Sequence, residues 1–145
     1  MSTRFGQIII KDIGKLREEI SLFKNDADLW KLTGGIKNTP GNLCLHICGN
    51  LKHYLGEALG NTGFKRDRDS EFTKKGISKE ELLKEIDETA GVISRCLNTL
   101  NEEKLGEKYP RDYYGDNITV GHALVITALH FNYHLGQINY HRRII

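Results

Sequence analysis

Residues 119–141 read TVGHALVITALHFNYHLGQINYH, and apolar side chains recur along this stretch at steps of three and four positions. Such steps return a side chain to the same face of an α-helix, which turns about 100° per residue. Thr119 is a residue type that commonly caps helix N-termini. The stretch therefore predicts a long amphipathic helix whose core-facing seam consists of Val120, Leu124, Thr127, Phe131, His134, Ile138 and His141.

Three further stretches show the same helical spacing. Residues 9–30 predict a helix of about six turns, which Gly34 and Gly35 would end. Residues 39–60 open with Thr-Pro, a typical helix start, and residues 78–100 open with Ser-Lys-Glu-Glu, which has the form of a capping box. Four such helices without an alternating strand pattern predict an all-α four-helix bundle.

Two segments between these helices lack a helical period. Residues 61–77 are predicted to form a crossover loop, and residues 104–117, with two glycines, a proline and three tyrosines, the next loop. We expect the bundle to be antiparallel, either with simple up-and-down wiring or with a long crossover, and the pattern leaves both wirings open. Within the first loop we expect Arg–carboxylate pairs that fold over the end of the bundle, with Phe72 as an anchor.

Length and composition limit the class of protein. The chain has 145 residues, 39% of them hydrophobic, which suits one domain with a single core over residues 1–145. A formal net charge of +2 without a basic block argues against nucleic-acid and membrane partners. No stretch resembles a signal peptide or a membrane span, so we expect a soluble, cytoplasmic protein. Three cysteines, an odd number without a scaffold spacing, predict no structural disulfide.

Two histidines four residues apart, His130 and His134, project from one side of the last predicted helix. This spacing alone is a weak metal-binding motif that needs a third ligand. The predicted helix at 39–60 carries a polar stripe at steps of four, three and four, formed by His46, Asn50, His53 and Glu57. Because seven residues return a helix to nearly the same direction, His46 and His53 are equally suitable third ligands.

The same polar stripe is also typical of the solvated side of an amphipathic helix. The last helix argues for the metal, because His134 lies on its apolar seam and His130 lies beside it. An imidazole there costs about 1–3 kcal/mol unless it finds a partner. Three histidines from two facing helices would hold a divalent ion and leave at least one coordination position open.

Three segments carry a resemblance to a known family. They are LHICGNL at 45–51, RDRDSEF at 66–72 and HFNYHLGQI at 130–138. In this order they resemble the motifs of the DinB-like (damage-inducible) superfamily of metal-dependent proteins. The resemblance implies a four-helix bundle, often a homodimer, that holds a divalent ion, zinc or nickel. When the ligand positions of these motifs are carried over to this sequence, the resemblance implies His46, His130 and His134 as the metal ligands.

Four further residues are candidates for the surroundings of this site. The resemblance does not place His53 on a ligand position, so we expect it to line the pocket or support a ligand. Asn50 and Gln137 are expected either to orient a ligand or touch substrate, or to form hydrogen bonds between helices. Arg68, like Arg66, either belongs to the structural ion pairs or meets an anionic substrate at the mouth of the pocket.

Two functions are compatible with these residues. The resemblance implies a metal-dependent enzyme acting on a small molecule, either a transferase that uses a low-molecular-weight thiol such as bacillithiol or mycothiol, or a hydrolase. No strong general base is evident from the sequence, so the ion would supply most of the chemistry. The alternative is a non-catalytic, dimeric stress protein that binds a metal or a small ligand.

Overall fold

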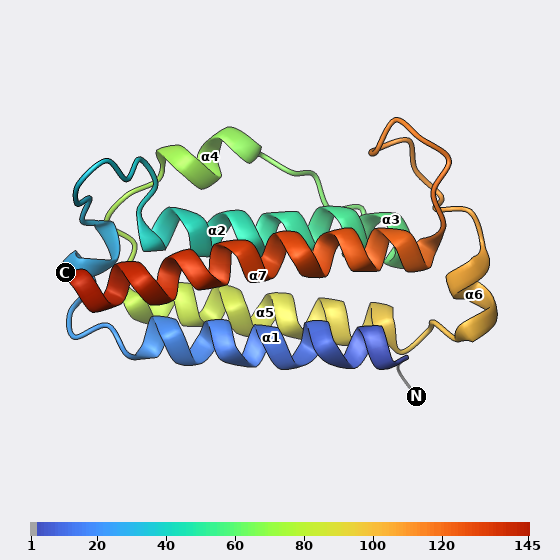
Figure 1. The fold of residues 1–145 in the computed structure, drawn as a ribbon, viewed down its shortest axis with the longest axis horizontal. Coiled ribbons are helices and arrows are strands. Elements are labelled where there is room, and N and C mark those ends of the chain that lie inside the picture. The colour runs from blue at the N-terminus through green and yellow to red at the C-terminus, as the bar shows by residue number, and fades with distance from the viewer. Residues whose placement is uncertain (1–2) are drawn as a thin grey trace.

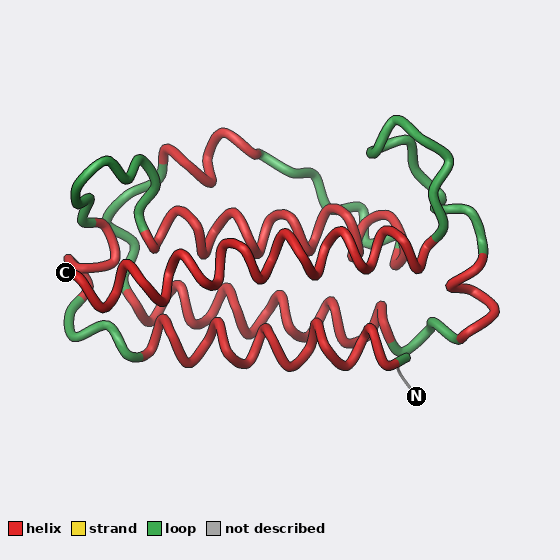
Figure 2. Tube along the Cα trace, in the orientation of Figure 1, coloured by secondary structure: helices red, strands yellow, loops and turns green. Residues whose placement is uncertain are grey.

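The computed structural model describes residues 3–145, and over these residues it consists of helices joined by loops, without a strand (Figures 1 and 2). The bundle is formed by α1 (Arg4–Ser21), α2 (Pro40–Leu51), α5 (Lys79–Leu97) and α7 (Val120–Ile144). The helix that begins as α2 continues as the π-helical segment η2 (Lys52–Glu57) and then as α3 (Ala58–Gly60). The predicted all-α four-helix bundle is confirmed.

The chain joins these helices through one long crossover. α1 packs against α5 and α7, and α2 packs against the same two helices, so α1 and α2 lie diagonally opposite each other. Figure 1 shows α2 and α5 running in one direction and α1 and α7 in the other. Only the neighbouring pairs α1–α5 and α2–α7 are therefore antiparallel. Of the two wirings that the sequence allowed, the crossover is present.

The crossover contains a short helix, α4 (Arg68–Thr73), where the sequence predicted only a loop. Asp67 starts it, because its side chain accepts a hydrogen bond from the backbone amide of Ser70 (3.2 Å). α4 packs along the outside of α2 (Figure 1), not over the end of the bundle as expected. This position brings residues 66–72 to the side of α2 that also faces α7.

The first helix is shorter than predicted. α1 ends at Ser21, and a separate 3₁₀ helix, η1 (Asp26–Trp30), follows instead of a continuous helix to Trp30. Asn25 starts η1, because its side chain accepts a hydrogen bond from the amide of Asp28 (3.1 Å). Such local side-chain bonds compete with continuation of a helix. Leu29 of η1 is nevertheless fully buried, which explains why the apolar spacing persists beyond the helix end.

The predicted helix starts are confirmed. Thr39, Ser78 and Thr119 each accept a hydrogen bond from a backbone amide in the first turn, and Ser78 forms the full capping box with Glu81. The second predicted loop begins with one more short helix, α6 (Glu102–Gly106).

Apolar side chains from all four long helices fill the space between them. The largest fully buried ones are Ile9, Leu16, Ile20, Leu29, Ile47, Leu51, Leu55, Leu82, Ile86, Ile93, Leu97 and Phe131. Burying a side chain of this size contributes about 1.5–3 kcal/mol, so this core fixes α2 and α7 relative to each other. The three cysteines are buried as free thiols. Among the described residues, no helix combines the length and apolar character that crossing a bilayer requires.

Candidate metal centre

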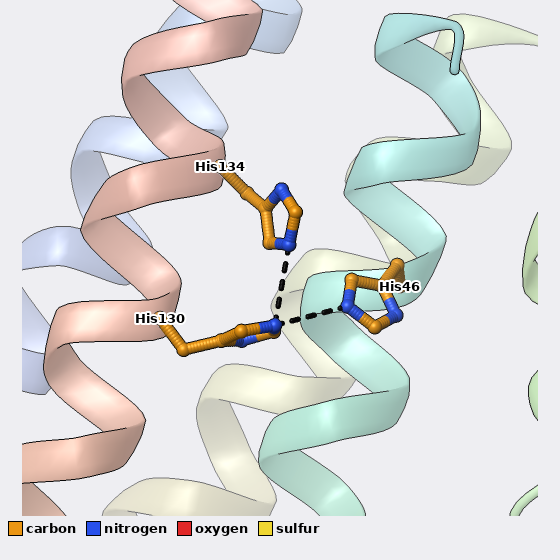
Figure 3. A group of neighbouring side chains, drawn as sticks. All are labelled: His46, His130 and His134. Atoms are coloured by element: carbon orange, nitrogen blue, oxygen red, sulfur yellow. Dashed lines mark hydrogen bonds between the residues drawn. The ribbon is translucent and has the colours of Figure 1, made fainter. Parts of the chain in front are cut away.

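Three histidine side chains from α2 and α7 meet between these helices (Figure 3). Nε2 of His130 lies 3.2 Å from Nε2 of His46 and 3.2 Å from Nε2 of His134. One ring nitrogen from each residue lies within 4.8 Å of the other two. The structure thus brings together the three residues that the resemblance implied as ligands, and their cluster could hold a metal ion.

The donor set fits a divalent ion of the zinc type. An ion held tetrahedrally at about 2.0–2.1 Å from nitrogen spaces neighbouring ligands by about 3.3 Å, close to the two Nε2 distances found here. Burial, followed by the neighbouring His134 and His46, lowers the pKa of His130 to about 4, and burial also lowers the pKa of His134. Both rings are therefore neutral near pH 7, which is the form in which imidazole binds a metal.

A buried carboxylate orients His46. Glu71 is only 6% exposed, and its Oε1 lies 3.0 Å from Nδ1 of His46. Burial alone would raise the pKa of Glu71, but hydrogen bonds from His46 and Arg66, together with the charge of Arg66, lower it below its usual range. An ionised carboxylate only accepts hydrogen bonds, so Nδ1 of His46 carries the proton and Nε2 presents its lone pair to the cluster.

Arg66 completes this arrangement. Its Nε donates to Oε2 of Glu71 and its Nη2 donates to Oε1, each at 2.9 Å, which is a two-point guanidinium–carboxylate pair. Nη2 also lies 3.3 Å from Nδ1 of His46. Since both nitrogens carry protons, the carboxylate is the acceptor that they share. The expected Arg–carboxylate pair is present. It supports the candidate metal ligand His46 and does not close the end of the bundle.

Two residues of α2 allow Glu71 to come this close. A Cβ on Gly49 would lie 1.9 Å from Oε2 of Glu71, so the carboxylate occupies space that only a glycine leaves free. Nδ2 of Asn42 donates to the backbone carbonyls of Glu71 (2.9 Å) and Lys74 (2.8 Å), and thereby holds α4 against α2.

The two histidines of α7 have different surroundings. Nδ1 of His134 lies 2.7 Å from Oε1 of Gln137, so the amide oxygen can accept the ring proton and leave Nε2 free. Nδ1 of His130 is buried and has no hydrogen-bond partner among the described residues. His134 does not lie in the core as its seam position suggested, because the neighbouring Leu135 takes the buried position.

A cavity of about 390 Å³ opens beside the cluster. Asn50, Arg68 and the rings of Tyr54, Phe72 and Tyr114 line it together with the three histidines. Asn50 and Arg68 thus lie in the wall of this cavity. The Phe72 ring also packs against His46, with ring centroids 4.9 Å apart.

His53, by contrast, does not reach this cavity. Its ring stacks on Tyr113 with centroids 4.1 Å apart, and burial lowers its pKa. The reason is the π-helical segment η2, which starts at Lys52 and has more residues per turn than an α-helix. The regular periodicity that made His46 and His53 equivalent fails there, and Tyr54 takes the pocket-facing position.

Glu57, the last residue of the polar stripe, is also outside the cavity. Its carboxylate accepts hydrogen bonds from Arg111 (2.9 Å) and from the hydroxyl of Tyr113. The hydrogen bond from Arg111, followed by that from Tyr113, lowers the pKa of Glu57. Glu57 fastens the loop before α7 to the end of the bundle. The carboxylate at the histidine cluster is Glu71, for which the sequence predicted only an ion pair. The one signal for its contact with His46 was the glycine one turn after that histidine, at Gly49.

Comparison with known proteins adds a family. A family model described as "Protein of unknown function (DUF1572)" matches residues 10–145. The matched region contains all three histidines, Arg66 and Glu71. No curated protein matches the chain.

Proposed function

The chain belongs to the DUF1572 family of proteins of unknown function, and we propose that it is a metal-dependent enzyme acting on a small molecule. In this proposal His46, His130 and His134 hold a divalent ion, zinc or nickel. The observation that carries it is the convergence of three imidazole nitrogens beside a cavity, with the ring of His46 fixed by buried Glu71.

An open site is favoured over a closed structural one. Structural zinc sites have four protein ligands, whereas catalytic sites commonly have three and leave a position for water or substrate. No fourth His, Cys, Asp or Glu joins the cluster in the part of the chain that the structure describes. An ion bound here would lower the pKa of a water or thiol in its open position and so supply a nucleophile near neutral pH.

The side chains have separate roles in this proposal. Glu71 and Gln137 accept the Nδ1 protons of His46 and His134, so that both Nε2 lone pairs point to the cluster. The rings of Tyr54, Phe72 and Tyr114 form part of the cavity wall and exclude water from one side of a bound molecule. The described lining contains no carboxylate that could act as a general base in direct contact with substrate. The resemblance to DinB-like proteins supports two reactions, transfer to a low-molecular-weight thiol and hydrolysis.

Metal analysis tests the proposal. Untagged protein is loaded with zinc or nickel, dialysed and analysed for bound metal by mass spectrometry, beside the His130→Ala and His122→Ala variants. His122 is an exposed histidine on the same helix and serves as the matched control. We expect about one ion per chain in the wild type and in His122→Ala, and its loss in His130→Ala. A wild-type protein that retains no ion after loading would refute the metal-dependent function.

A non-catalytic metal- or ligand-binding protein is the second candidate, and the exposed apolar face of α7 favours it because such faces are typical of interaction surfaces. The stability of the metal-free protein separates the two. The apolar core is complete without an ion, so an open functional site leaves a folded protein whose melting temperature rises with metal only by mass action. Unfolding on metal removal would favour the structural role.

We also propose that the protein is a homodimer formed by α7. Leu129, Tyr133, Tyr140 and Ile144 lie on one side of this helix and are 68%, 66%, 74% and 63% exposed. Gly136 lies between them, and a Cβ there would meet no atom within 4 Å, so a second α7 can approach closely at this point. A two-fold axis would bury the same stripe on both copies. Light scattering after gel filtration should give a dimer for the wild type and a monomer for Leu129→Glu; a monomeric wild type would contradict the dimer.

A further inference from the structure

The charges around the cavity are not balanced. Two arginines, Arg66 and Arg68, line it, and no Asp or Glu is among its described lining residues. Arg66 is neutralised, because both its Nε and its Nη2 donate to Glu71. Arg68 has no carboxylate partner among the described residues. The cavity therefore has one unneutralised guanidinium in its wall, to which a bound divalent ion would add further positive charge.

Arg68 is also held in place although it is exposed. Its guanidinium lies over the ring of Phe72, 5.4 Å from the centroid, which is the geometry of a cation–π contact. Phe72 in turn packs on His46. The helix that carries both residues is tied to α2 by the hydrogen bonds of Asn42. Arg68 is thus oriented before a ligand arrives, which reduces the entropy lost on binding.

Three aromatic rings share the remaining wall with one aliphatic and three neutral polar residues: Tyr54, Phe72 and Tyr114, with Ile126, Asn38, Asn50 and Thr127. Tyr54 and Tyr114 face each other in a tilted arrangement with ring centroids 5.1 Å apart, and both line the cavity. Phe72 contacts both Arg68 and His46, so a molecule that reaches from Arg68 to the histidines would pass this ring. The wall favours an apolar or aromatic middle section over a charged one.

We propose that Arg68 binds an anionic group, such as a carboxylate, of the molecule whose other end reaches the histidine cluster. This inference rests on the proposed function and specifies its substrate class: a small anion with an apolar middle section. Guanidinium suits the role because it can donate two parallel hydrogen bonds to a carboxylate. Arg66 is less suited, since Glu71 already neutralises its charge and accepts from its Nε and Nη2, the edge that would form such a pair.

Matched thiols test the inference by binding. The probes are mercaptoalkanoates of four, six and eight carbons, each compared with the mercaptoalcohol of the same length. Cobalt(II)-loaded protein is titrated with each, and the thiolate-to-cobalt absorption gives a dissociation constant without any turnover. Arg68→Gln removes the charge, Arg68→Lys keeps it, and Lys65→Gln removes a nearby exposed charge that lines a different cavity.

We expect the wild type to bind the mercaptoalkanoate of the best-fitting length about tenfold more tightly than its alcohol. Arg68→Gln should lose this preference while its affinity for the alcohol stays unchanged. Arg68→Lys should retain part of the preference, and Lys65→Gln all of it. Equal affinities for acid and alcohol at every length, or a preference that survives in Arg68→Gln, would overturn the inference and leave the proposed function standing. A cobalt spectrum that no thiol changes would overturn the inference, and a protein that retains no cobalt after loading would overturn the proposed function as well.

Discussion

Glu71 and Gly49 fix the orientation of His46 although neither belongs to the histidine cluster. Glu71 accepts the Nδ1 proton of His46 and is itself held by Arg66, and Gly49 leaves the space that the carboxylate fills. A carboxylate behind a ligating histidine fixes the tautomer and raises the basicity of the ring. At the residue scale, the site therefore depends on these supporting side chains as well as on the ligands.

Replacing Glu71 with glutamine keeps the size of the side chain and removes its charge. We expect zinc affinity to fall about 10–100-fold. The free energy of unfolding should fall by about 3 kcal/mol, because Arg66 is left largely buried without its counter-charge. Competition with a chromophoric chelator measures the first change and chemical denaturation the second. Glu80→Gln, on the exposed first turn of α5, is the control, and unchanged zinc affinity in Glu71→Gln would refute the supporting role.

Gly49→Ala should displace the carboxylate, because the new Cβ would lie 1.9 Å from Oε2 of Glu71. We expect a loss of about 1–3 kcal/mol of stability together with weaker zinc binding. Gly14→Ala is the matched control, since a Cβ there meets nothing within 4 Å and alanine should stabilise α1 by about 0.5–1 kcal/mol. Thermal melts and zinc titrations of both variants make the comparison. Equal behaviour of the two alanine variants would contradict the close approach at Gly49.

The metal-free protein should lose stability on acidification, starting below pH 6.5. Burial lowers the pKa of His130 from 6.5 to about 4, so between these values the unfolded chain binds a proton that the folded protein does not. Folding is thereby disfavoured progressively as the pH falls, and the effect is complete near pH 4. Melting temperatures of chelator-treated wild type and His130→Ala between pH 7.5 and 4.5 should show a shallower decline in the variant. Parallel declines would show that His130 does not contribute.

At the scale of elements, the sequence predicted those helices that are long enough to show a period. α2, α5 and α7 follow their apolar spacing and their caps, and α2 and α7 carry the three candidate ligands. α4, with six residues, is too short to show a period, and the π-helical turn of η2 has no local sequence signal. The contact between Glu71 and His46 joins residues 25 positions apart through α4, so periodicity could not reveal it.

Asn42 ties α4 to α2, and its replacement by alanine tests this link. The variant leaves the carbonyls of Glu71 and Lys74 without the donor that now satisfies them. We expect hydrogen exchange of the α4 amides to accelerate about tenfold, with a loss of about 1–3 kcal/mol in stability. Core amides of α5 serve as the internal reference. Their hydrogen exchange should accelerate only by the factor that corresponds to the loss of global stability. Unchanged relative protection of α4 would contradict the link.

At the scale of the whole molecule, the crossover wiring determines where the site lies. Because residues 61–78 run back along the bundle, they place α4 over the side of α2 and bring Glu71, Arg68 and Phe72 to the histidines. A bundle with short connections would leave the cluster without these residues. The apolar core holds α2 and α7 in register, and the exposed stripe of α7 lies on the same helix as two of the three histidines.

X-ray absorption at the zinc edge of the untagged, zinc-loaded protein tests the three-histidine centre most directly. A three-histidine centre gives nitrogen neighbours at about 2.0–2.1 Å from zinc, with the multiple scattering of three imidazoles. In His134→Ala we expect the scattering of two imidazoles. A spectrum with oxygen neighbours and no imidazole scattering, or one unchanged in His134→Ala, would contradict the three-histidine centre.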